Sequence, residues 1–182
     1  MKSPILRIAI IGPESTGKST LAAALANHYR SKWAPEYARA YLEKLGRPYE
    51  QADLIEIARG QIEKEEKALI NARDFVFFDT NLEVIKVWSK YIYDSIPDPI
   101  LHWHKARHYD AYLLTNIDLP WTFDPLREHP ESSDRQAIME MYLQICRNAE
   151  VPYKIIKGTE QERMESAISF LDAIKKSKET HP

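Results

Sequence analysis

The stretch Gly12-Pro-Glu-Ser-Thr-Gly-Lys-Ser19 follows the apolar run from Ile5 to Ile11 and decides the fold. It fits G-x-x-x-x-G-K-[ST], the pattern of a loop that wraps phosphates. Gly12 and Gly17 let the backbone turn sharply and aim successive N–H groups inward, which makes a concavity for an anion. An apolar strand precedes this loop and a helical pattern follows it, as such a site requires. The stretch therefore predicts a nucleotide site rather than an ordinary turn.

The residues of this loop have distinct expected tasks. The helix that begins near Lys18 adds the partial positive charge of its N-terminus. We expect Lys18 to reach the β- and γ-phosphates of ATP, and the Ser19 hydroxyl to ligate Mg²⁺. The expected ATP contacts in the loop are Gly12, Pro13, Glu14, Ser15, Thr16, Gly17, Lys18, Ser19 and Thr20.

Length and composition describe an ordinary globular chain. Its 182 residues suit one domain, expected at 1–182, and the formal net charge of −2 supplies no general attraction for nucleic acid or an anionic membrane. The longest apolar run is too short for a bilayer, and the N-terminus does not read as a signal peptide. Cys146 is the only cysteine, which excludes an internal disulfide and favours the cytoplasm. Nothing in the sequence indicates an oligomeric state.

Apolar runs alternate with helical patterns, which predicts an α/β fold with a parallel sheet. We expect a P-loop NTPase fold, related to nucleoside and nucleotide kinases, with five parallel strands flanked by helices. The expected strands are 6–11, 32–35, 75–78, 111–114 and 153–156. A helical insertion is expected at about 36–73, with the charged run 63–67 on its solvated face, and a lid at about 119–135. Ligands then collect at the carboxyl ends of the strands.

Two carboxylates follow predicted strands. Asp79 ends an apolar strand, a usual place for a Mg²⁺ ligand, although Asp there also suits a helix N-cap. Glu36 follows the second strand and is suited to accept a hydroxyl proton from a phosphate acceptor. Arg39, one turn later, would steady Glu36 or a phosphate; the alternative is a surface ion pair of little energetic weight.

Two arginines accompany the predicted lid. Arg127 lies in the irregular segment and Arg135 just after it. Phosphoryl transfer spreads negative charge over the equatorial oxygens, and arginines that close over that charge are a recurrent solution. Either arginine alone would be an ordinary surface residue, so their shared location carries the prediction.

Four aromatic residues offer flat faces for a ring: Trp88, Tyr91, Tyr112 and Trp121. Aromatic residues at helical spacing are more often core residues than a base slot. Trp121 is the best stacking candidate because its loop follows a strand end, and the adjacent Asp118 is suited to a ribose hydroxyl or a cationic ring. The histidines at 102, 104 and 108 do not favour zinc, because positions two apart do not share a helix face.

Together these stretches resemble the ribosylnicotinamide kinase domain at the C-terminus of bacterial NAD-biosynthesis regulators. The resemblance runs from about Ile5 to Leu171. Its matching stretches are Gly12–Leu21, Pro35-Glu-Tyr-Ala-Arg39, Asp79-Thr-Asn-Leu82, Lys86-Val-Trp-Ser89, Tyr112-Leu-Leu114, Asp118-Leu-Pro-Trp121 and Asp124-Pro-Leu-Arg127.

The resemblance implies an ATP- and Mg²⁺-dependent kinase that phosphorylates the 5′-hydroxyl of nicotinamide riboside. It implies that Glu36 and Asp79 divide the roles of base and metal ligand, without saying which does which. Lys157 and Gly158 would lie near adenine, with no indication of ATP or GTP preference. The implied substrate-binding set is Glu36, Tyr37, Arg39, Asn81, Trp88, Asp118 and Trp121.

The larger members of that family also carry an adenylyltransferase domain and a DNA-binding helix-turn-helix. No H-x-G-H motif occurs in this sequence, and the first strand starts almost at its beginning. We therefore expect this chain neither to make NAD from the mononucleotide nor to repress transcription. Two alternatives remain: a kinase for another nucleoside or small hydroxyl compound, and an ATP-binding sensor or switch without an acceptor.

Overall fold

Strand β1 (Leu6–Ile11) lies at the centre of the sheet, because its last four residues are apolar and buried between two helical layers. The structure is a computed structural model and describes residues 4–126 and 131–180. All the strand pairs in the sheet are parallel, in the order β2-β3-β1-β4-β5. The other strands are β2 (Lys32–Ala34), β3 (Phe75–Asp79), β4 (Ala111–Thr115) and β5 (Tyr153–Ile156). The predicted P-loop fold with a five-stranded parallel sheet is confirmed.

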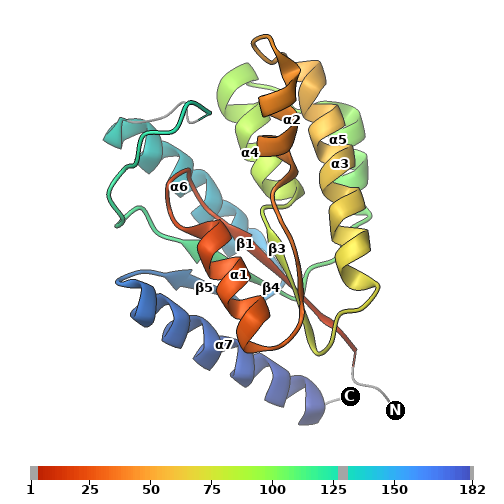
Figure 1. The fold of residues 1–182 in the computed structure, drawn as a ribbon, viewed down its shortest axis with the longest axis vertical. Coiled ribbons are helices and arrows are strands. Elements are labelled where there is room, and N and C mark those ends of the chain that lie inside the picture. Colours follow the sequence, from red (N-terminus) through yellow and green to blue (C-terminus); the bar gives the residue numbers. More distant parts are fainter. Residues whose placement is uncertain (1–3, 127–130, 181–182) are drawn as a thin grey trace.

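Helices cover both faces of this sheet (Figure 1). On one face, α1 (Lys18–His28) and α7 (Glu160–Thr180) bury Leu25, Leu171 and their neighbours against β1, β3 and β4. On the other face, α6 (Ser132–Asn148) packs Tyr142 and Cys146 over β4. Apolar side chains on both sides of the strands thus produce a three-layer core.

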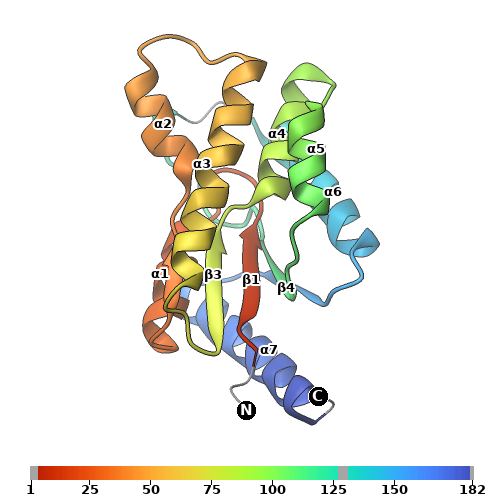
Figure 2. The ribbon, with the colours of Figure 1, turned by 90° about the vertical axis from the view of Figure 1, so that its right-hand side faces the viewer.

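A second group of helices extends beyond the carboxyl ends of β1 and β3, and the last part of its helix α3 runs down beside the sheet (Figure 2). It contains α2 (Tyr37–Leu45), α3 (Gln51–Leu69), α4 (Leu82–Tyr93) and α5 (Asp98–Lys105). Their shared core includes Leu54, Ile57, Leu82 and Ile100. The predicted helical insertion corresponds to α2 and α3. Helices α2 and α4 of this group line a cavity that the loop following β1 also lines.

One expectation about α3 is wrong. The run 63–67 does not lie entirely on a solvated face, because helical periodicity places Gln61, Glu65 and Ala68 on the buried side. Glu65 accepts hydrogen bonds from Arg107 Nε at 3.0 Å and from the Tyr109 hydroxyl, and burial raises its pKa to about 7. Within the described ranges, no helix is both long enough and apolar enough to span a membrane.

Candidate active site

A cavity of about 420 Å³ opens at the carboxyl ends of the strands. The phosphate loop, residues 12–20, forms one side of it. Side chains from α2, α4 and α6 form the other side, and Pro125 and Leu126 of the predicted lid reach its edge. A site for polyphosphate and a site for a second molecule therefore share one space.

The phosphate loop is held in shape by its own backbone and by β4. Lys18 Nζ donates to the carbonyl oxygens of Gly12 and Pro13, at 2.9 and 2.8 Å. Gly12 has φ 141°, and a Cβ there would lie 2.5 Å from Thr115 Oγ1, so only glycine fits. The buried Thr16 hydroxyl contacts the Thr115 hydroxyl at 2.7 Å and donates to the Pro13 carbonyl. These contacts hold the loop in a curved shape that suits an anion.

Arg163 ties this loop to the ends of β4 and β5, a role that sequence reasoning missed. Its Nη1 donates to the Thr16 carbonyl at 2.8 Å and its Nε to the Gly158 carbonyl at 2.9 Å. Its Nη2 pairs with Asp118, whose other oxygen accepts the Gly158 N–H at 2.6 Å. Nothing in the sequence distinguishes Arg163 from the exposed charges of its helix.

Asp118 and Gly158 therefore belong to the side of the phosphate loop that faces β5. Asp118 was expected beside the acceptor, but it does not line the cavity there. Its pairing with Arg163 places it next to Lys157 and Gly158, the pair expected near adenine. The difference arises because β4 lies between β1 and β5, so the chain leaving β4 turns toward β5.

Asp79 ends β3 next to the phosphate loop, because Ile10 pairs with it across the sheet. Its side chain is 2% exposed, and its Oδ1 has no hydrogen-bond partner in the described part of the chain. Burial raises its pKa, and the Ser19 hydroxyl and the Lys18 charge act against that rise. A buried carboxylate oxygen without a partner, beside the Ser19 hydroxyl, fits the oxygen ligands that Mg²⁺ takes.

Glu36 precedes α2 and lines the same cavity. Burial raises its pKa, while the opposite charge of Lys18 lowers it and the like charge of Asp79 raises it further. Glu36 and Asp79 thus both interact electrostatically with Lys18 at the mouth of the phosphate loop. Arg39 lines the cavity as well, and its Nη2 binds Asp124 Oδ2 at 2.8 Å, which joins α2 to the predicted lid.

An aromatic wall faces the phosphate loop across the cavity. Trp88 and Tyr91 of α4 contribute to it, as do Tyr49 and Tyr142. Trp88 Nε1 donates to the Tyr49 hydroxyl at 2.9 Å, and the two ring centroids are 4.9 Å apart at an interplanar angle of 66°. Sequence reasoning missed Tyr49, because it lies in the connection between two helices and follows no periodic pattern.

Several further predicted residues do not line the cavity: Asp79, Arg135, Lys157 and Gly158 are absent from its lining, as are four more. Tyr37 packs on α3, where a Cβ at Gly60 would lie 2.2 Å from its ring. Asn81 caps α4 by accepting the Glu83 N–H at 3.1 Å. The Arg135 guanidinium carbon lies over the Trp121 ring, 5.6 Å from the ring centroid. Tyr112 is a buried residue of β4 and belongs to the core.

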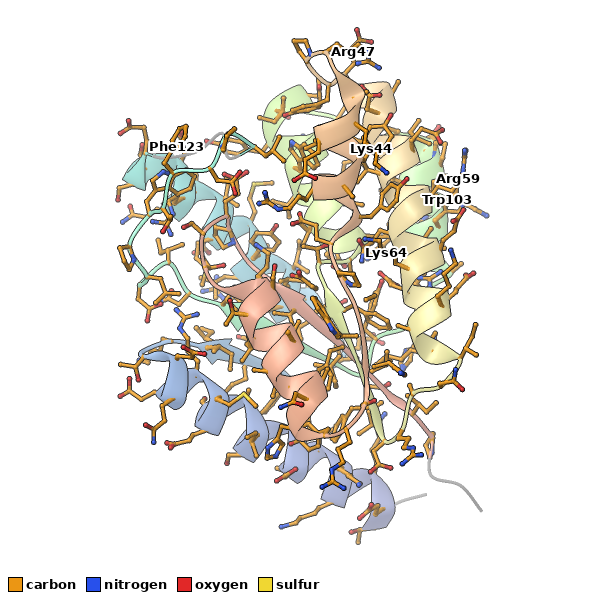
Figure 3. The ribbon with its side chains drawn as sticks, in the orientation of Figure 1. Lys44, Arg47, Arg59, Lys64, Trp103 and Phe123 are labelled. Carbon is orange, nitrogen blue, oxygen red and sulfur yellow. The ribbon has the colours of Figure 1, made fainter. Side chains whose placement is uncertain are left out.

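The predicted lid is described only in part. Residues 116–126 leave β4 and reach the edge of the cavity, whereas Arg127 lies outside the described residues. Arg135 is 8% exposed, in the first turn of α6. The exposed Phe123 lies on the opposite side of the view from Lys64 and Arg59 of α3 (Figure 3).

The fold and the phosphate loop define a P-loop protein with the fold of nucleoside and nucleotide kinases. The family model described as AAA domain, AAA_28, matches residues 7–163, and the chain belongs to this family. A curated relative is the trifunctional NAD biosynthesis/regulator protein NadR of Salmonella typhimurium, 28% identical over 160 residues. That match covers 85% of this chain and 39% of the relative, so the chain spans about two fifths of its length.

Solved structures give the same fold. NadR in complex with NR aligns with a TM-score of 0.72 and 20% identity, covering 94% of this chain and 51% of that chain. Thymidylate kinase from Candida albicans aligns with a TM-score of 0.67 and 14% identity, covering 100% of this chain and 96% of that chain.

Proposed function

We propose that this chain transfers the γ-phosphate of ATP to the 5′-hydroxyl of nicotinamide riboside. The observation that carries the proposal is that the phosphate loop, Glu36 and an aromatic wall share one cavity, with the buried Asp79 at the end of the neighbouring strand β3. Its volume of about 420 Å³ falls in the range of small-molecule sites. The names of the relatives, an NAD biosynthesis protein and a structure with NR, support this acceptor over others.

The aromatic wall suits the cationic pyridinium ring of nicotinamide riboside. Trp88, Tyr49 and Tyr91 present electron-rich faces, which attract a cation and stack on a flat ring. This wall replaces Trp121 as our candidate for the ring. Arg39 and Arg47 line the same cavity, and Arg47 is paired with Asp53. Arg39 remains suited to the phosphate that is transferred.

The carboxylates divide two tasks. Asp79 and Ser19 would hold Mg²⁺, which supplies charge neutralisation at the β- and γ-phosphates when it is bound. Glu36 then accepts the proton of the acceptor hydroxyl. Lys18 stabilises the charge of the transferring phosphoryl group, and we assign the same task to Arg127 and Arg135 from their place in the sequence. Lys157 and Gly158 border the adenine.

An ADP-release assay over a panel of nucleosides, with and without Mg²⁺, tests the proposal. We expect Mg²⁺-dependent turnover with nicotinamide riboside and little with other nucleosides. Lys18→Ala is the matched negative control, because it removes transition-state stabilisation while the fold remains; we expect a loss of about 10²-fold or more. Turnover only with another nucleoside would assign a different acceptor. ATP binding without any acceptor-dependent ADP would indicate a sensor.

A further inference from the structure

Gln61 of α3 connects the two backbone segments that carry Glu36 and Asp79. Its side chain is 1% exposed. Its Oε1 accepts the N–H of Tyr37 at 2.9 Å, and its Nε2 donates to the carbonyl of Thr80 at 3.3 Å. Tyr37 directly follows Glu36, and Thr80 directly follows Asp79. The Gln61 side chain thus links the backbone next to Glu36 with the backbone next to Asp79.

Both bonds satisfy backbone groups at places where regular structure ends. Tyr37 is the first residue of α2, and the first N–H groups of a helix have no partner within the helix. Thr80 follows β3 with φ 67° and is 4% exposed, so a carbonyl there needs a donor from elsewhere. A carboxamide carries a donor nitrogen and an acceptor oxygen, and this pair of partners sets its orientation.

Neighbouring residues of α3 support the same junction. Gly60 leaves room for the Tyr37 ring, where a Cβ would lie 2.2 Å from it. Lys64, one turn beyond Gln61, extends toward the start of α2 (Figure 3) and donates to the Glu36 carbonyl at 3.2 Å. The start of α2 is therefore docked on α3 by packing and by two hydrogen bonds, and the Gln61 side chain also bonds the residue that follows β3.

We propose that Gln61 is a positioning residue that fixes the general base, Glu36, relative to the metal ligand, Asp79. This inference rests on the proposed function, in which those two carboxylates act on one phosphoryl transfer. Gln61 itself does not line the cavity. It acts through the backbone of its two partners, as outer-shell groups do around metal sites.

Gln61→Met tests the inference, because methionine has a similar length and makes neither bond. We expect kcat to fall about 10- to 100-fold, as for other outer-shell groups. The KM for ATP should change less than about threefold, because Gln61 does not contact the phosphate loop. Gln51→Met is the matched control: Gln51 begins the same helix and donates to Ser95 Oγ at 2.8 Å, away from both carboxylates. It should keep the wild-type kcat.

A second variant guards against a failure to fold. Gln61→Glu keeps an acceptor for the Tyr37 N–H and loses the donor for the Thr80 carbonyl, so kcat should again fall with the KM for ATP preserved. If wild-type protein phosphorylates no acceptor, the proposed function has failed, and Mn²⁺ binding in the presence of a non-hydrolysable ATP analogue decides about Gln61. Electron paramagnetic resonance should then show an altered Mn²⁺ spectrum in Gln61→Met, because displacement of Asp79 would change the surroundings of the metal, while the Mn²⁺ affinity changes less than about threefold.

The inference is overturned if folded Gln61→Met matches Gln51→Met in kcat. For an inactive wild type, it is overturned if the two variants give the same Mn²⁺ spectrum. A parallel loss of kcat and of ATP affinity would also overturn it, because it would indicate a general structural defect rather than displaced carboxylates.

Discussion

At the scale of single residues, burial sets the acid–base properties of the site. Glu36 would be a weak base with an ordinary pKa, and its burial raises that pKa toward the range in which a base works at neutral pH. The nearby Lys18 charge opposes the rise and keeps the ionised form accessible. The same two influences act on Asp79. Two desolvated carboxylates, Glu36 lining the cavity and Asp79 buried beside the phosphate loop, thus interact with the ammonium group of Lys18.

Glu36→Gln tests the role of the base. The ionised form is the active one, so kcat should fall as the pH drops through the raised pKa of Glu36. The substitution should lower the rate at neutral pH by about 10²- to 10⁴-fold, the usual range for a general base. ATP affinity should change little, because a glutamine at this position keeps the shape of the side chain. A pH–rate profile and an ATP titration measure both, and an unchanged rate would remove Glu36 from the mechanism.

At the scale of elements, the start of α3 shapes one edge of the cavity. Asp53 accepts the N–H of Glu50 at 2.8 Å and two bonds from Arg47, which lines the cavity. The Glu50 side chain completes a capping box. The hydrogen bonds from Arg47 and from the Glu50 backbone lower the pKa of Asp53 below its ordinary value of 3.8.

Asp53→Ala should lower the free energy of unfolding at pH 7 by about 1–2 kcal/mol, the cost of losing a helix cap. Because the folded-state pKa of Asp53 lies below the unfolded one, its contribution is complete above pH 3.8 and is lost as the pH falls toward the folded-state value. Urea unfolding at pH 7 and pH 3 should therefore show that the free energies of unfolding of the wild type and Asp53→Ala differ less at pH 3 than at pH 7. Glu56→Ala, an exposed pair with Arg59, is the control. A difference that does not depend on pH would contradict the ionic part of the explanation.

At the scale of the whole molecule, the cavity lies between two parts of the chain. The sheet positions the phosphate loop and, buried beside it, Asp79. The residue before α2 and α2 itself supply Glu36 and Arg39, and α4 supplies Trp88 and Tyr91 of the aromatic wall. A ligand that contacts both parts stabilises the folded state by mass action. At a free ligand concentration of a hundred times the dissociation constant, this stabilisation amounts to about 2.7 kcal/mol.

Saturating Mg·ATP should therefore raise the melting temperature by about 5–10 °C for a domain of this size. Thermal denaturation with Mg·ATP, and with ATP plus EDTA, measures the shift and its metal dependence. Lys18→Ala should reduce the shift, because it removes a contact with the β- and γ-phosphates. An equal shift in Lys18→Ala would place the nucleotide elsewhere.

Local features of the sequence were sufficient for the fold and for the phosphate loop. The loop motif is contiguous, and the buried strands are short apolar runs, so neighbours in the chain already define them. The position of Asp79 beside the loop could also be predicted from the sequence, because parallel strands end at one edge of the sheet.

The outer parts of the site depended on contacts between distant residues. Gln61 reaches a partner 24 residues away, and Arg163 reaches one 147 residues away. Tyr37, Asn81 and Asp118 were predicted near the acceptor, yet packing on Gly60, the cap of α4 and the pair with Arg163 place them elsewhere. The sequence alone determined the strand–loop–helix unit that is suited to phosphates. Only the tertiary structure decided which side chains face that unit, because helix docking brings together positions that no local pattern relates.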